Sequence, residues 1–102
     1  MGPVATIYHG YMDRRSFTRI SKALADPRRY EILRRIAACK SEASCLMLKE
    51  KFPITPATLS HHLKELSSAG LIEIRRNSKF MYVQLRKNVW NQYLKELRSL
   101  SE

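Results

Sequence analysis

Side chains that can donate hydrogen bonds or carry positive charge gather in residues 55–64, TPATLSHHLK. Leu59, Leu63 and Leu66 recur at spacings of four and three residues, the period of one face of an α-helix. Because each residue turns a helix by about 100°, the opposite face must point outward. That face and its flanks hold mostly small, polar or basic residues: Ala57, Thr58, Ser60, His61 and Lys64. Hydroxyl, imidazole and ammonium groups on a slender helix can reach the base edges and phosphates of DNA.

Residues that favour the start and the end of a helix flank this stretch. The Thr55 hydroxyl can accept a hydrogen bond from a free amide of the first turn, and Pro56 suits the first helical position, where no amide donor is needed. Gly70 can adopt the left-handed conformation that ends many helices. We therefore expect a helix of about four turns over residues 55–70.

A second group of basic residues follows this helix. After Gly70 the apolar residues alternate, which predicts a strand at 71–76 and a returning strand at 79–85, with Asn77 and Ser78 in the turn between them. The cations near the tip of this hairpin are Arg75, Arg76 and Lys79. Long cations of this kind, Lys64 included, bind phosphates rather than read bases. The hairpin is thus a second surface for an anionic partner.

The rest of the chain is predicted to be helical. We expect further helices at 13–25, at 26–39, at 44–51 and from Asn88 onward. Asp13 and Asp26 are the expected N-caps of the first two, Asn88 is the expected N-cap of the last, and Pro53 stops the third. The segment 40–44 is short and polar, which suits a loop. The third helix and the helix at 55–70 are joined by a few residues, which is the pattern of a helix-turn-helix.

The last helix carries more apolar surface than a small core can cover. Its apolar residues occupy more than one narrow stripe: Val89, Trp90, Tyr93, Leu94, Leu97 and Leu100. An exposed patch of this size is typical of an interaction surface. We therefore expect a second chain to cover part of it.

Composition limits the remaining possibilities. The chain has 102 residues, 44% of them hydrophobic, enough for one domain with one modest core. Lys and Arg number 19 against 9 Asp and Glu, and the net charge of +10 favours a polyanionic partner. The apolar runs are far shorter than the roughly 20 residues that span a bilayer, and residues 1–12 lack the pattern of a secretion signal. We expect a cytoplasmic protein with no membrane contact, an N-terminal arm at 1–12 and a single domain at 13–102. The arginines of the first two helices are expected to be solvated: Arg14, Arg15, Arg28, Arg29, Arg34 and Arg35.

Two stretches of the chain resemble the ArsR family of bacterial dimeric transcription repressors. They are KALADPRRYEILRRIA and TPATLSHHLKELSSAGLIEIRRNSKFMYVQL, and the likeness runs from about Ile20 to Leu85. The resemblance implies a mainly α fold with a small β-hairpin, the winged helix-turn-helix. It also implies a homodimer that represses transcription at a palindromic promoter site, with two recognition helices in successive major grooves of double-stranded DNA and two wings over the flanking backbone.

The resemblance also assigns roles to individual positions. The implied DNA contacts are Thr55, Ala57, Thr58, Ser60, His61 and Lys64 on the helix and Arg75, Arg76 and Lys79 on the hairpin. The implied homodimer forms through the first and last helices, at Phe17, Ile20, Val89, Trp90, Tyr93, Leu94, Leu97 and Leu100.

The chain departs from the metal-sensing members of that family. Many of them carry Cys-x-Cys where this chain has residues 44–46, Ser-Cys-Leu, and one cysteine does not make a metal site. Others use carboxylate and His ligands on the last helix, which has no His or Asp here. His61 and His62 point about 100° apart on a helix, and His9 stands alone. We therefore expect no metal and no other cofactor.

Cys39 and Cys45 are too few for a disulfide framework. In the cytoplasm they are expected to act as small buried hydrophobic residues. They also form a possible redox pair, because a short loop between them can bring their α-carbons within the roughly 7 Å that a disulfide allows. Under that hypothesis oxidation would link them and change DNA affinity.

Two other classes of function are alternatives to DNA binding. A winged helix can instead recognise RNA or protein, with Phe80 and Tyr82 stacking on bases, although we favour the interpretation that these rings cover the hairpin or a dimer interface. An enzyme is not expected, because the chain has no Gly-rich phosphate loop, no nucleophile in a recognised setting and no cluster of carboxylates with His.

Overall fold

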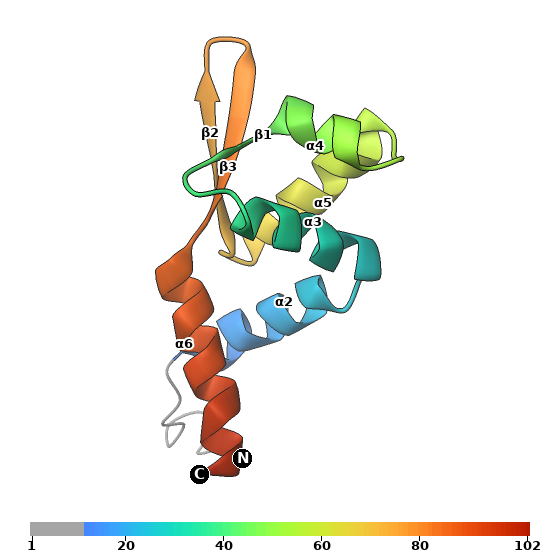
Figure 1. Ribbon diagram of the computed structural model, residues 1–102. Coiled ribbons are helices and arrows are strands. Elements are labelled where there is room, and N and C mark those ends of the chain that lie inside the picture. Colours follow the sequence, from blue (N-terminus) through green and yellow to red (C-terminus); the bar gives the residue numbers. More distant parts are fainter. Residues whose placement is uncertain (1–11) are drawn as a thin grey trace.

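A helix-turn-helix packs beside an antiparallel hairpin in the computed structural model, which describes residues 12–102 (Figure 1). The elements are α2 (Arg14–Leu24), α3 (Pro27–Ala37), β1 (Ala43–Ser44), α4 (Cys45–Lys51), α5 (Pro56–Ser68), β2 (Ile72–Asn77), β3 (Phe80–Leu85), α6 (Lys87–Arg98) and the 3₁₀ turn η1 (Ser99–Ser101). This arrangement confirms the predicted winged helix-turn-helix. The predicted arm lies outside the described residues except for Met12, which packs against the core. No helix of residues 12–102 is long and apolar enough to cross a membrane.

The sheet has one strand more than predicted. Its order is β1-β3-β2, with both pairs antiparallel, so Val83 of β3 faces Ile74 on one side and Ala43 on the other. Residues 40–44 were expected to form a loop, but two residues of strand are too short to show a period in sequence. The hairpin turn also lies one residue later than predicted. Asn77 pairs with Phe80, so the turn is Ser78 and Lys79, and Ser78 has a φ of 59°.

Side-chain caps fix where the helices begin. Asp13 accepts a hydrogen bond from the Ser16 amide (2.7 Å) and Asp26 from the Arg29 amide (2.9 Å), as predicted for the first two helices. The predicted cap of the last helix is wrong. α6 begins at Lys87, ahead of Asn88, and its N-cap Arg86 has no side-chain cap. Instead the Arg86 amide donates to the Leu71 carbonyl (2.8 Å), so the end of the sheet sets the start of α6.

The core joins all layers of the fold. Its completely buried side chains come from α2, α3, α4, α5, the sheet and the residue just before β2: Ile20, Ile32, Ile36, Leu48, Leu59, Leu66, Leu71, Ile72 and Val83. α5 ends as predicted, because Gly70 has a φ of 83° and the Leu71 amide donates back to the Leu66 carbonyl (3.0 Å). This left-handed residue turns the chain from α5 directly into β2.

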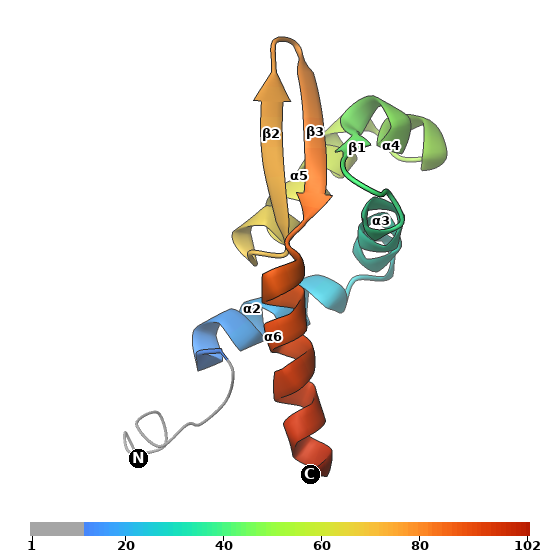
Figure 2. The same cartoon turned by 60° about the vertical axis from the view of Figure 1, so that its left-hand side comes forward.

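α6 extends away from the helix-turn-helix, on the opposite side from the tip of the hairpin (Figure 2). Near its middle the Tyr93 ring lies 5.2 Å from the Phe17 ring, and its hydroxyl hydrogen-bonds to Ser21 of α2 (2.9 Å). Tyr93 is buried and Ile20 has no exposed surface. The predicted contact of Ile20 and Tyr93 with a partner gains no support, because Ile20 lies in the core and Tyr93 packs against α2 within one chain.

Three charged or titratable side chains meet where α3 crosses α5. Arg29 is only 12% exposed in its side chain; its Nη1 donates to the Ala23 carbonyl (3.3 Å) and its Nη2 lies 4.0 Å from the Asp26 carboxylate. The prediction that Arg29 is solvated is wrong. Its Nε donates to Nδ1 of the buried His62 (3.4 Å), which requires an unprotonated Nδ1. Burial lowers the pKa of His62 despite the opposing effect of Asp26.

This junction predicts a loss of stability in mild acid. The pKa of His62 is lower in the folded chain than its ordinary value of 6.5, so below that pH the unfolded chain binds more protons. The free energy of unfolding should decrease as the pH falls from 7.5 to 5.5, as measured by urea unfolding. His62→Gln should weaken this dependence, and His61→Gln, which changes the neighbouring exposed ring, should preserve it. An equal pH dependence in all three proteins would contradict the assignment.

Candidate nucleic-acid interface

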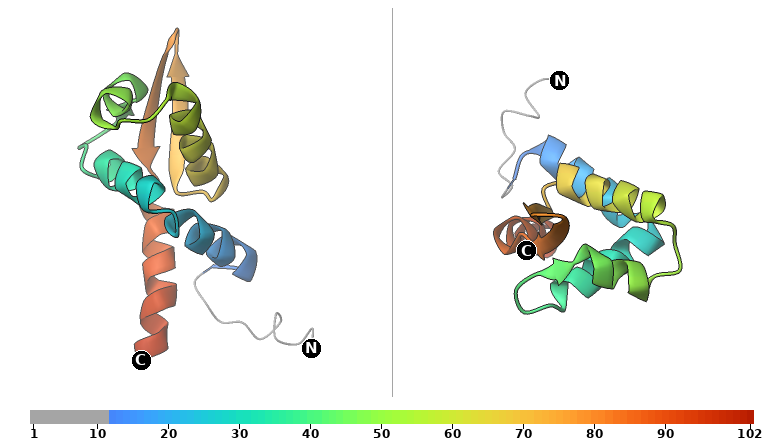
Figure 3. Two further views of the ribbon diagram at one scale, coloured as in Figure 1. Left: turned by 90° about the vertical axis from the view of Figure 1, so that its right-hand side faces the viewer. Right: turned by 90° about the horizontal axis from the view of Figure 1, so that it is seen from above.

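The outer face of α5 is open to solvent. Leu59, Leu63 and Leu66 point inward and are buried, while the residues predicted to contact DNA from this helix are all exposed: Thr55, Ala57, Thr58, Ser60, His61 and Lys64. α5 lies along the outside of the fold, next to the hairpin (Figure 3). Its first turns carry short side chains, so this end of the helix can approach another surface closely.

The N-terminal turn of α5 uses some of its hydroxyl groups internally. Thr55 Oγ1 accepts from the Thr58 amide (3.1 Å), which is the predicted cap, and donates to Thr58 Oγ1 (2.9 Å). The Thr58 hydroxyl keeps its own proton for an outside acceptor. Thr55 thus mainly positions the helix, whereas Thr58 presents a donor to solvent.

The two adjacent histidines have different surroundings. The His61 ring is exposed on the outer face, and the His62 ring, 5.9 Å away, is buried against α3. Within residues 12–102 no three His, Cys, Asp or Glu side chains are grouped so that they could hold a metal ion. His9 lies outside the described residues, and the expectation that the protein binds no metal stays a prediction.

The cations of the basic hairpin differ in their internal partners. Arg75 forms a bidentate pair with Glu42, with both nitrogen–oxygen distances at 2.8 Å, and its guanidinium lies 5.1 Å from the Tyr82 ring centre. Hydrogen bonds from Arg75 lower the pKa of the Glu42 carboxyl. In contrast, within the described part of the chain neither Arg76 nor Lys79 has a carboxylate within 4.0 Å. The phosphate-binding potential of the hairpin therefore lies mainly in these two residues.

Sequence reasoning missed Glu42. It lies 33 residues before Arg75, in a polar segment that carries no periodic signal. The edge strand β1 follows it directly and pairs with β3, the strand that also pairs with β2, so Glu42 comes within reach of Arg75. The same geometry covers part of the Tyr82 ring, whereas Phe80 remains half exposed at the hairpin.

Both cysteines are free thiols in different surroundings. Cys39 Sγ lies 3.6 Å from the Arg35 carbonyl at the end of α3, and Cys45 begins α4. Burial raises the pKa of the Cys45 thiol, an effect that the nearby Lys49 and Arg76 only partly oppose. A raised pKa reduces the reactive thiolate. The oxidation of this pair stays a prediction.

Comparison with known families matches the same part of the fold. A family model described as a helix-turn-helix domain matches residues 24–75, from the end of α2 into β2. The chain is 36% identical to the HTH-type transcriptional regulator YceK of Bacillus subtilis (strain 168), over 86% of this chain and 93% of that protein. It is 39% identical to an arsenical resistance operon repressor of Staphylococcus xylosus, over 70% of this chain and 67% of that protein.

Solved structures share the arrangement of the whole domain. An ArsR-like transcriptional regulator from Rhodococcus sp. RHA1 superposes with a TM-score of 0.75 at 21% identity, over 85% of this chain and 80% of that one. The homodimeric winged helix-turn-helix DNA-binding domain of a possible ArsR-family regulator from Mycobacterium bovis gives 0.68 at 28% identity, over 85% and 84%.

The family match covers half of the chain, and the YceK match covers nearly all of that relative. The exposed polar face of α5 lies within the matched residues. The chain therefore belongs to the ArsR family of helix-turn-helix, DNA-binding transcriptional regulators, which are not enzymes.

Proposed function

We propose that this regulator is a homodimeric repressor that binds a palindromic promoter site in double-stranded DNA. The observation that carries the proposal is the exposed polar face of α5 beside a hairpin whose Arg76 and Lys79 have no carboxylate partner among residues 12–102. A helix of this width fits the major groove, and long cations beside it replace counterions on the backbone. Occupying a promoter would block transcription without any further chemistry.

The proposed contacts divide into two kinds. Ala57, Thr58, Ser60 and His61 are short or polar and would approach base edges in the major groove. Lys64 on the helix and Arg76 and Lys79 on the hairpin would bind phosphates. Arg75 would contribute less, because Glu42 already neutralises its charge.

The proposed dimer forms through α6, the η1 turn that follows it and the exposed side of α2. Leu97 is 39% exposed and Leu100 is 83% exposed. The other members of this surface are partly buried: Phe17, Val89, Trp90 and Leu94. The Mycobacterium bovis domain is described as homodimeric, which supports this assembly. Two recognition helices about 34 Å apart would read two half-sites one helical turn apart, hence a palindrome.

Repression is the proposed outcome of binding. The Staphylococcus xylosus relative is a repressor of an arsenical resistance operon, which supports repression here. The sequence lacks the metal ligands found in metal-sensing members of the family. The proposal therefore includes repression but not a response to arsenicals.

Substitutions on the two elements should weaken DNA binding. His61→Ala, Lys64→Ala and Arg76→Ala should each reduce affinity about fivefold or more for a duplex selected from a random library. Arg76→Ala should also lower the slope of log affinity against log salt by about one unit, because one phosphate contact is lost. Gel shifts would measure both, with Arg34→Ala, an exposed cation of α3, as the control. Unchanged binding after all three substitutions, or preferential binding of single-stranded RNA, would refute the proposed interface.

Removing the Glu42 carboxylate should strengthen DNA binding. Glu42→Gln frees the Arg75 guanidinium and removes a negative charge beside it, so affinity for the selected duplex should rise and the salt slope should steepen by about one unit. Glu31→Gln is the matched control, because Glu31 also pairs with an arginine, Arg28 at 3.8 Å, but on α3. Weaker binding of Glu42→Gln would instead mean that the pair positions Arg75 for DNA.

Charge on the apolar face of α6 should separate the protomers. Leu97→Asp should shift the mass in sedimentation equilibrium from two copies toward the single 11.9 kDa chain, because the carboxylate would be buried without a partner in the dimer. Leu46→Asp changes an exposed leucine on α4, 57% exposed against 39% for Leu97, and should leave the dimer intact. Circular dichroism should show both variants folded. A Leu97→Asp protein that remains dimeric would rule out this surface.

A further inference from the structure

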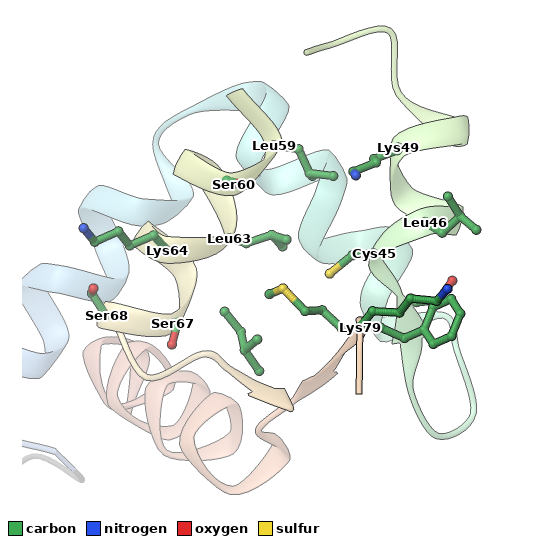
Figure 4. A pocket seen from close by; sticks show the side chains of 14 residues that line it. Cys45, Leu46, Lys49, Leu59, Ser60, Leu63, Lys64, Ser67, Ser68 and Lys79 are labelled. Carbon is green, nitrogen blue, oxygen red and sulfur yellow. The ribbon is translucent and has the colours of Figure 1, made fainter. Parts of the chain in front are cut away.

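A cavity of about 550 Å³ opens between α4, α5 and the hairpin (Figure 4). Its walls come from the first turns of α4, from the flank of α5 that lies next to its leucine stripe, and from β2 and β3. Small-molecule sites in proteins usually have volumes of roughly 300–1,000 Å³. The cavity is large enough for a molecule with a body of several carbon atoms.

The walls are mainly apolar. Leu59 and Leu63 of α5 and Cys45 of α4 turn toward the same space from opposite sides (Figure 4). The hairpin completes the lining with Ile74, Phe80 and Met81. Phe80 and Leu46 of α4 remain 49% and 57% exposed beside the opening. An apolar ligand would remove surface of both residues from water.

The rim of the cavity is cationic. Lys49, Lys64 and Lys79 lie among its lining residues, which within the described part of the chain include no Asp or Glu, and the Lys64 side chain points away from the space (Figure 4). Lys49 extends from α4 to the edge of the space beside Leu59 (Figure 4). Serine hydroxyls add hydrogen-bond donors from α4's cap and from α5: Ser44, Ser60, Ser67 and Ser68. Apolar walls with positive charge at the mouth match a molecule that is apolar at one end and anionic at the other.

We propose that this cavity binds a small organic anion with an apolar body, of the class of medium-chain carboxylates. The hydrocarbon lies between Leu59, Leu63 and the hairpin, and the carboxylate binds at Lys49 and Lys79. The ligand also regulates DNA binding, a step that rests on the proposed function. It adds negative charge between α5 and the hairpin, the two elements proposed to contact phosphates, and therefore weakens the complex with DNA.

Octanoate is the probe that tests the site. It is titrated into the full chain by calorimetry and by ¹H–¹⁵N NMR, at concentrations where it does not aggregate, with octanol and acetate as comparison ligands. Octanoate should bind and shift the amides of Cys45, Lys49 and Met81. Acetate should bind more than about a hundredfold more weakly, because it lacks the buried chain, and octanol about fivefold more weakly, because it lacks the charge. Equal binding of either comparison ligand would overturn the proposal.

Matched variants test the charge and the wall. Lys49→Gln should weaken octanoate binding about fivefold, while Lys51→Gln, on the same helix but outside the cavity, should leave it unchanged. Leu46→Ala should weaken binding, and Tyr30→Ala, an exposed apolar side chain of α3 outside the cavity, should not. The exposure of the substituted side chains keeps all four variants folded. Equal weakening by Lys51→Gln would show that net charge alone attracts the anion and would overturn the site.

Competition with DNA tests the regulation separately. Octanoate should reduce the affinity of the wild-type chain for the selected duplex, and the reduction should be smaller in Lys49→Gln. Octanoate that occupies the cavity without weakening the DNA complex would overturn the regulatory step. A chain that binds octanoate but no duplex would overturn the proposed function and support the octanoate site. A chain that binds the duplex but not octanoate would support the proposed function and overturn the site.

Discussion

The leucine stripe of α5 is the packing constraint on which the rest of the structure depends. Leu59, Leu63 and Leu66 are buried on the face of α5 that packs against the rest of the domain, and this burial fixes the rotation of the helix about its own axis. Replacing one such buried leucine by alanine typically costs about 2–5 kcal/mol, a large share of the roughly 5–15 kcal/mol that stabilises a domain. Because the stripe can face only inward, the residues opposite to it must face solvent. The polar surface of the regulator is a consequence of its core.

Charge is distributed less simply than the net value of +10 suggests. Arg29 supports the crossing of α3 and α5 by binding His62, and Arg75 braces the hairpin against Glu42. Neither guanidinium is fully available to a phosphate. Lys64, Arg76 and Lys79 stay exposed around one end of the fold, and Lys49 lies beside them at the cavity. The position of each carboxylate therefore decides which of the many cations can act on an anion.

Local signals in the sequence were sufficient for most of the fold. The caps at Asp13, Asp26 and Thr55, the left-handed Gly70 and the leucine spacing are interactions between residues close in the chain, so composition and period reveal them. The same holds for the exposed face of α5. What the sequence could not show depends on distant partners. Strand β1 is only two residues long and forms by pairing with β3. The start of α6 is set by the hydrogen bond from the Arg86 amide to the Leu71 carbonyl rather than by Asn88. Ile20 is apolar and was assigned to the interface, but the fold buries it completely.

The Arg86 amide joins three elements at one point. Its hydrogen bond to the Leu71 carbonyl fastens the start of α6 to the residue that follows Gly70, where α5 ends and β2 begins. A single residue, Arg86, separates β3 from α6, so there is no linker to absorb a rotation. In the proposed dimer, a change in the angle between the two α6 helices would thus be carried to the base of both DNA-contacting elements in each protomer. The distance between the two DNA half-sites would then be set by the dimer interface rather than by motion within either protomer.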